Sequence, residues 1–191
     1  MKNLRRLALV AGVAALSAIA FSPKAQAQTA NVDFSGSIGP ACIINSVTNG
    51  TLVPVGTQIL AANSAFGTPG NINVTCTNGT TFTITGITDN GSSLTTGTYA
   101  TGISLIAAQI LDVGAGGTDP LGNPMDLTVA IAQVSPDGNN GIGFPVGVAG
   151  PLQAAAITNK NYPVNLNLTK NGVNLSSGFY KVRVGVALTP Q

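Results

Sequence analysis

The sequence predicts an all-β sandwich, and three observations support this fold class. Apolar and polar residues alternate in several short segments, as they do in half-buried strands. Clusters containing Gly, Asn and Pro separate these segments and have the composition of turns. Beyond the first 27 residues, no stretch keeps a helical period for more than two turns. Strands at this spacing, without intervening helices, favour a sandwich over a parallel α/β sheet.

The start of the chain has the pattern of an export signal. Three basic residues lie within the first six positions, and residues 7–21 form a continuous apolar stretch. This stretch is shorter than the roughly 20 apolar residues of a membrane-spanning helix. Residues 25–27 then read Ala-Gln-Ala, a small-x-small cleavage pattern. We predict that residues 1–27 are a signal peptide and that no membrane span remains after its removal; the alternative is a retained anchor.

Removing this segment changes the charge of the protein. The 164 residues from position 28 onward carry four basic residues and six Asp, a net charge of −2, and they lack His, Glu and Trp. No basic face is available for nucleic acid, so nucleic acid is not an expected partner. So few charges are unusual for a free, highly soluble monomer and fit a protein that buries surface against copies of itself.

Two cysteines, Cys42 and Cys76, lie in the mature part of the chain. A pair of cysteines in an exported protein predicts a disulfide bond. On the chain-entropy model, a bridge closing a loop of this length stabilises the fold by about 2–4 kcal/mol. The alternative is two free, buried thiols.

Alternation places the predicted strands along the whole mature chain. One face of each segment is apolar and is expected to face the core. Residues 104–113 fit a buried strand or a short helix by pattern alone, and we favour the strand. The alternating segments are residues 32–38, 72–76, 82–86, 127–131, 164–168 and, most clearly, 182–188.

Turn residues predict how these strands are connected. The pairs Asn78-Gly79, Asn90-Gly91 and Asn171-Gly172 tolerate positive φ and favour tight hairpins. Residues 119–124 and 135–141 have the composition of longer loops. No linker, second domain or internal repeat is evident.

The sequence lacks residues that common catalytic and metal sites require. Without His, neither a Ser-His-Asp nor a Cys-His site can move a proton, and without His a zinc site would have only two Cys ligands. Without Glu, a glycosidase pair would rest on Asp residues alone, and these lie in or near predicted turns or strand ends. We therefore expect no enzyme activity, no cofactor and no metal site.

Four features occur in the order found in one known family. An alternating segment contains Val32, Phe34, Gly36 and Ile38 and precedes Cys42; Cys76 ends a later strand; residues 77–85 read TNGTTFTIT; and a Gly precedes the final alternating strand. In this order the chain resembles the subunits of chaperone–usher fimbriae, in particular the spore-coat-U-like branch. The motifs lie at both ends of the mature chain and around the cysteines.

The resemblance implies an immunoglobulin-like sandwich (residues 40–191) that lacks its last strand. The N-terminal extension (residues 28–39) of the next subunit would complete it by donor-strand exchange, with Val32, Phe34, Gly36 and Ile38 as the donor residues. It also implies a disulfide between Cys42 and Cys76. The acceptor groove would lie beside the final strand, at Gly178, Val182, Val184, Val186 and Leu188. The chain departs from the family at Pro190, where many members have Tyr, which puts the chaperone contact there in doubt because Pro donates no ladder hydrogen bond.

The function implied is that of a structural subunit of a fimbria. Its expected partners are other copies or related subunits, a periplasmic chaperone and an outer-membrane usher. It would pass through the periplasm and act at the cell surface. Two alternatives stay open: residues 31–39 form the first strand of a closed, self-sufficient sandwich, or the chain is a secreted surface-coat or carbohydrate-binding module, for which Tyr99, Tyr162 and Tyr180 are the available tyrosines.

Overall fold

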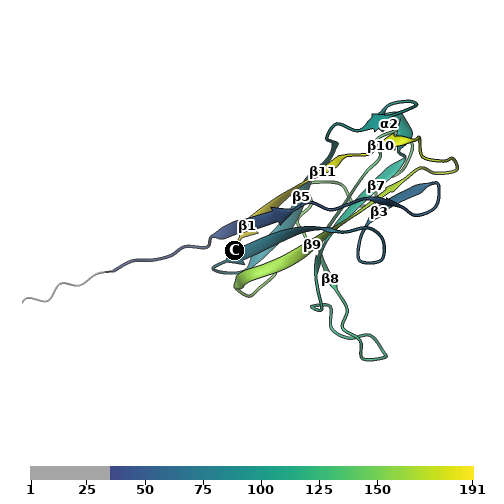
Figure 1. Cartoon of the computed structure of the whole chain (residues 1–191). Helices are drawn as coiled ribbons and strands as arrows, with labels where there is room; N and C mark the ends of the chain where they lie inside the picture. The colour runs from purple at the N-terminus through teal and green to yellow at the C-terminus, as the bar shows by residue number, and fades with distance from the viewer. Residues whose placement is uncertain (1–34) are drawn as a thin grey trace, which may run out of the picture. The chain divides into compact units, whose positions relative to one another are not determined.

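The computed structural model describes residues 35–191 of the chain (Figure 1). The predicted signal peptide and two donor residues, Val32 and Phe34, lie outside the described residues. Two units are distinguished by their contacts, and Ile38–Gln191 is the larger, compact one. Its strands and sheets confirm the predicted all-β sandwich.

The larger sheet of the sandwich is antiparallel throughout. Strand β9 lies at its centre, with β7 and then β8 on one side; β4 followed by β1, and β3 followed by β2, share the other side. Its strands are β1 (Cys42–Thr48), β2 (Val53–Pro54), β3 (Ile59–Ala62), β4 (Gly70–Cys76), β7 (Leu105–Asp112), β8 (Leu127–Val134) and β9 (Ile157–Thr169).

A smaller sheet consists of two long strands, β5 (Thr80–Asp89) and β11 (Val182–Pro190), paired along their whole lengths. The far edge of β5 is covered, because Gly147 and Gly150 donate backbone hydrogen bonds of 2.8 Å to Ile84 and Phe82. Within residues 35–191, β11 pairs with β5 alone. The outer edge of β11 is therefore an open sheet edge.

Short elements close one end of the sandwich. Strands β6 (Ser93–Leu94) and β10 (Gly178–Phe179) form a two-stranded sheet, and α2 (Tyr99–Gly102) is a single helical turn. No helix among the described residues is long and apolar enough to cross a membrane.

The core lies between the two sheets and is formed by the inward residues of the alternating segments. The Phe82 ring of β5 packs on the Tyr162 ring of β9 with centroids 4.5 Å apart. Val74, Ile106 and Leu168 are fully buried around them. Burial of such side chains contributes about 1.5–3 kcal/mol each, so alternation in the sequence is what holds the layers together.

The predicted strand segments between residues 72 and 188 are confirmed, whereas residues 35–38, the described part of the predicted segment 32–38, form no strand. Residues 104–113, ambiguous by pattern, contain strand β7. Its burial alternates residue by residue, which a helix buried on one side would not show. The other predicted segments lie in β4, β5, β8, β9 and β11.

The predicted Asn-Gly hairpins are wrong, although the turns themselves are present. Asn78-Gly79 connects β4 to β5, which belong to different sheets, and the other two pairs also connect strands that do not pair with each other. Gly91 and Gly172 do adopt positive φ, at 94° and 75°. Turn residues determine the local backbone conformation. The partner of the strand after the turn is instead determined by where its apolar face can be buried. A long loop, residues 113–126, instead closes the β7–β8 hairpin and projects from the sandwich (Figure 1).

Candidate functional site

The disulfide Cys42–Cys76 joins the edge strand β1 to β4, and this prediction is confirmed. The two residues are directly opposite in the register, with Cα atoms 4.1 Å apart. A disulfide indicates an oxidising environment of the kind exported proteins encounter. It also fixes which residues of β1 share a face with the buried residues of β4.

The inward face of β1 is apolar and open to solvent. Ile44 lies opposite Val74, and Val47 lies opposite Ile72, both of which are buried. Opposite residues of paired strands point to the same face, so Ile44 and Val47 face the core side of the sheet. They are nevertheless 40% and 67% exposed. Within residues 35–191, this face of β1 is therefore only partly covered.

The inward face of β11 is also incompletely covered. Its alternating residues Val182, Val184, Val186 and Leu188 pack against the core but remain only half-buried. Across the ladder, Phe82 and Ile84 of β5 are fully buried. Because the two strands share one sheet, this difference is explained by the outer edge of β11, which pairs with no strand within residues 35–191.

The backbone of β11 shows which groups that edge leaves unpaired. The Lys181 carbonyl accepts from the Asn90 N–H, and the Gln191 N–H donates to the Gly79 carbonyl, both at 2.8 Å. Both residues therefore turn their polar groups toward β5. Since these groups alternate along a strand, the even-numbered residues Val182 to Leu188 direct their N–H and C=O groups away from β5. They form a row of donors and acceptors ready for another strand.

Between these two edges lies a groove of about 1110 Å3. Val47 and Leu52 line one wall of the groove, and Val182 and Val186 line the other. The buried residue Ile72 also lines the groove. An apolar trough beside an unpaired strand edge is the binding site that β-strand addition requires.

Most of the predicted acceptor residues line this groove. Gly178, Val182, Val184 and Val186 do so, whereas Leu188 lies on the same face of β11 but outside the lining. Tyr180 also lines the groove and was not singled out from the sequence. It is the one alternate position between Gly178 and Leu188 that the predicted acceptor set left out.

The β1 wall was missed for a physical reason. A β-bulge interrupts the pairing between Ile44 and Ser46. It places Ile44 and Val47, three positions apart, on one face of the strand. A search for strict period-2 alternation does not find such a pair.

Gly178 occupies a backbone position that excludes a side chain. Its φ of 143° lies in a region that favours glycine. A Cβ atom there would collide with the Ser93 carbonyl oxygen on the paired strand β6. The glycine thus allows β10 to pair closely with β6 at the end of the groove.

The last two residues of the predicted donor segment, Ile38 and Gly39, belong to the larger unit and do not line its groove. Residues 35–39 form no strand, and Ile38 is 87% exposed and absent from the groove lining. A Cβ atom added at Gly36 would meet no atom within 4 Å. The Gly39 carbonyl accepts a hydrogen bond of 3.3 Å from the Thr77 hydroxyl.

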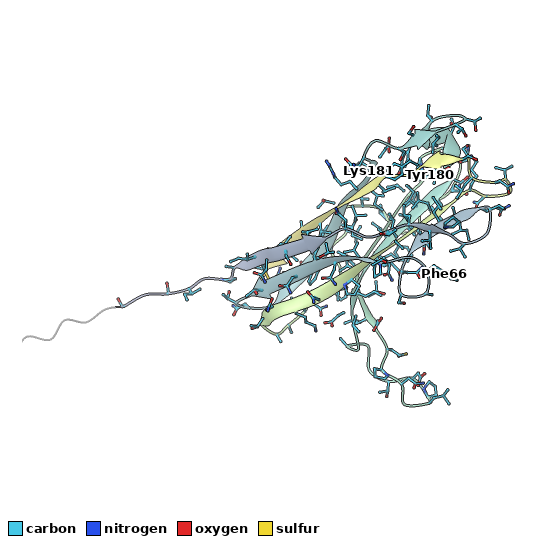
Figure 2. The ribbon with its side chains drawn as sticks, in the orientation of Figure 1. Phe66, Tyr180 and Lys181 are labelled. Carbon is cyan, nitrogen blue, oxygen red and sulfur yellow. A yellow bond between two sulfur atoms is a disulfide. The ribbon has the colours of Figure 1, made fainter. Side chains whose placement is uncertain are left out.

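The two charged residues that line the groove are both basic. Lys160 and Lys170 lie within 4.0 Å of Asp112 and Asp137, respectively. Lys181 and Arg183 have no carboxylate within 4.0 Å among residues 35–191, and both line the groove. Figure 2 shows the Lys181 side chain projecting from the ribbon beside Tyr180.

Hydrogen bonds within their own loops hold two of the Asp side chains. The Asn123 side chain and then the backbone N–H groups of the 119–124 loop lower the pKa of Asp119, and the Asn139 N–H lowers that of Asp137. Nowhere in residues 35–191 do three metal-ligating side chains gather. Tyr162 is buried, and Tyr99 and Tyr180 pack partly against the core, so the tyrosines do not share an exposed surface.

Comparisons with protein-family models, with curated proteins and with solved structures found no match to this chain.

Proposed function

We propose that the chain is a structural subunit of a cell-surface fibre, in which the N-terminal extension of one subunit fills the groove of the next. The observation that carries this proposal is the open groove between β1 and β11. Apolar side chains on both of its walls remain at least partly exposed, and within residues 35–191 the outer edge of β11 has no partner strand. One inserted strand would bury these side chains and complete the ladder.

The sequence of the extension suits this role. Val32, Phe34 and Ile38 would face the groove, and each contributes about 1.5–3 kcal/mol if buried. Gly36 would let the inserted backbone approach the groove closely. Because donor and groove lie on different parts of the chain, the contact is head-to-tail and repeats without closing, which builds a filament.

Export and assembly follow the same proposal. The disulfide of the protein is consistent with export to an oxidising compartment. An exported subunit with an empty apolar groove is prone to aggregate. The resemblance to fimbrial subunits implies a periplasmic chaperone that covers the groove during export. It also implies an outer-membrane usher, at which the donor strand of the next subunit replaces the chaperone. The protein has no catalytic role in this proposal.

Deletion of residues 28–39 from the mature protein tests the proposal. We expect a folded subunit that no longer polymerises, because it retains its groove but has no strand to donate. A peptide of residues 28–39 added in trans should bind it and raise its Tm, since a ligand of the native state stabilises that state. The matched peptide with Phe34→Asp should not bind, because it would place an unpaired charge in an apolar groove.

Assembly is measured by electron microscopy and light scattering, and peptide binding by fluorescence anisotropy. A truncated protein that polymerises as the full mature chain does would contradict the proposal. A truncated protein that does not bind the peptide and has the same Tm as the full mature chain would also contradict the proposal.

A further inference from the structure

The basic side chains beside the groove lack partners, whereas the donor segment carries one acid. Arg183 and Lys181 are exposed and have no carboxylate within 4.0 Å among the described residues. Asp33 is the one charged residue in the sequence from 28 to 39. Opposite charges thus lie on the two partners that the proposed function brings together.

Strand alternation places these charges on the same face of the completed sheet. With Val32, Phe34, Gly36 and Ile38 turned into the groove, Asp33 points outward. Arg183 is exposed and lies between the inward residues Val182 and Val184, so it also points outward. Thr88, its cross-strand neighbour on β5, is uncharged, so Arg183 has no competing acid directly opposite in the ladder.

Resting on the proposed function, we infer that Asp33 of the incoming strand pairs with Arg183 and thereby sets the register and direction of insertion. The length of the groove selects the direction. Along the final segment the groove is lined from Leu175 to Val186, eight positions before Arg183 and three after it. The donor has five residues after Asp33, up to Ile38, so it fits only when it runs antiparallel to β11.

The same register matches large side chains with small ones. With Asp33 opposite Arg183 in an antiparallel pair, Gly36 lies opposite Tyr180, and Ile38 lies opposite Gly178. Tyr180 would then lie opposite a donor residue without a side chain, so the two strands can approach each other there. The parallel arrangement would instead place Ile38 opposite Leu188, beyond the groove lining.

Disulfide trapping between two variants of the mature chain tests this register while keeping Asp33 and Arg183 intact. Residues opposite the odd positions of β11 would form non-hydrogen-bonded pairs, whose Cα atoms lie about 4.5 Å apart, within reach of a disulfide. A subunit with Ser37→Cys is mixed with a subunit carrying one cysteine on β11 or next to it. A crosslink to Phe179→Cys indicates the inferred antiparallel register. A crosslink to Lys181→Cys indicates a register shifted by two residues, and one to Ala187→Cys indicates a parallel donor strand.

We expect the dimer with Phe179→Cys to form fastest. Adding Asp33→Arg to the donor subunit should reduce that rate about two- to fivefold, in keeping with an exposed ion pair, and should divert crosslinks to Lys181→Cys. Arg183→Asp in the acceptor should restore the original preference. High salt should weaken the wild-type preference because it screens exposed charges.

The possible failures are distinguishable. If none of the three acceptor variants crosslinks to the donor, both the donor-strand function and the register are overturned. If crosslinks form mainly with Lys181→Cys or Ala187→Cys, or if Asp33→Arg changes nothing, the ion pair is overturned while insertion of the donor strand stands.

Discussion

The Lys160 ammonium lies 2.7 Å from each carboxylate oxygen of Asp112, a residue that is only 4% exposed. The geometry gives a hydrogen bond to Oδ2 but none to Oδ1. Lys160 itself is partly exposed, so solvent reaches one side of the pair. The pair joins β7 to β9 in the larger sheet, and its main consequence is that Asp112 depends on Lys160 for compensation of its charge.

Replacing Lys160 should therefore destabilise the fold. We expect Lys160→Met to lower the free energy of unfolding by about 1–3 kcal/mol, less than for a fully buried pair because Lys160 is partly exposed. The double change Lys160→Met with Asp112→Leu should cost less than the single one, since no unpaired charge remains. Urea unfolding measures both. Lys181→Met, without a nearby carboxylate, is the control; a loss there equal to that of Lys160→Met would refute the explanation.

The two faces of β1 offer a matched pair of variants for the groove. Val47 faces the groove and Ile43 the opposite side, yet they are similarly exposed, at 67% and 62%. Val47→Asp should weaken binding of the 28–39 peptide about tenfold or more, because insertion would desolvate the new charge. Ile43→Asp should leave binding unchanged. Fluorescence anisotropy on the truncated subunit makes the comparison, and equal effects of both changes would argue against the groove as the binding site.

Gly178→Ala should destabilise the end of the sandwich near β6 and β10. The added methyl group meets the Ser93 carbonyl oxygen, and the backbone conformation is strained for alanine. We expect a loss of about 1–3 kcal/mol in thermal or urea unfolding. Gly141→Ala is the control, because Gly141 has open space and no positive φ. The interpretation fails if Gly178→Ala is as stable as the wild type.

Alkaline pH should destabilise the protein through Tyr162. Burial, together with the negative charge of Asp112, raises the pKa of Tyr162 to about 12 from its ordinary value near 10. Because the folded-state pKa is the higher one, the stability that this phenol contributes is complete below pH 10 and declines as the pH rises toward 12. Tyr162→Phe should reduce this decline. Unfolding curves at a series of pH values, followed by circular dichroism, would show no difference between the two proteins if the phenol is not responsible.

Alternation in the sequence was sufficient to predict the fold class and most strands. Val182 to Leu188 alternate strictly, and the strand found there is paired along its whole length. The cysteine pair was equally informative, since an exported chain with two cysteines favours one bond. Both signals are local or compositional, which is why they can be read without a structure.

Other features depend on contacts between distant segments and were decided only by the tertiary structure. Two of the three Asn-Gly pairs place their glycine at positive φ, as their composition favours. Pairing of the following strand instead depends on a partner far away in the sequence, as it does for β5 with β11. The bulge beside Ile44 hides the apolar face of β1 from a period-2 search. The open groove has no signature in the sequence. Whether the outer edge of β11 is paired can be known only when the partners of all the other described strands are known.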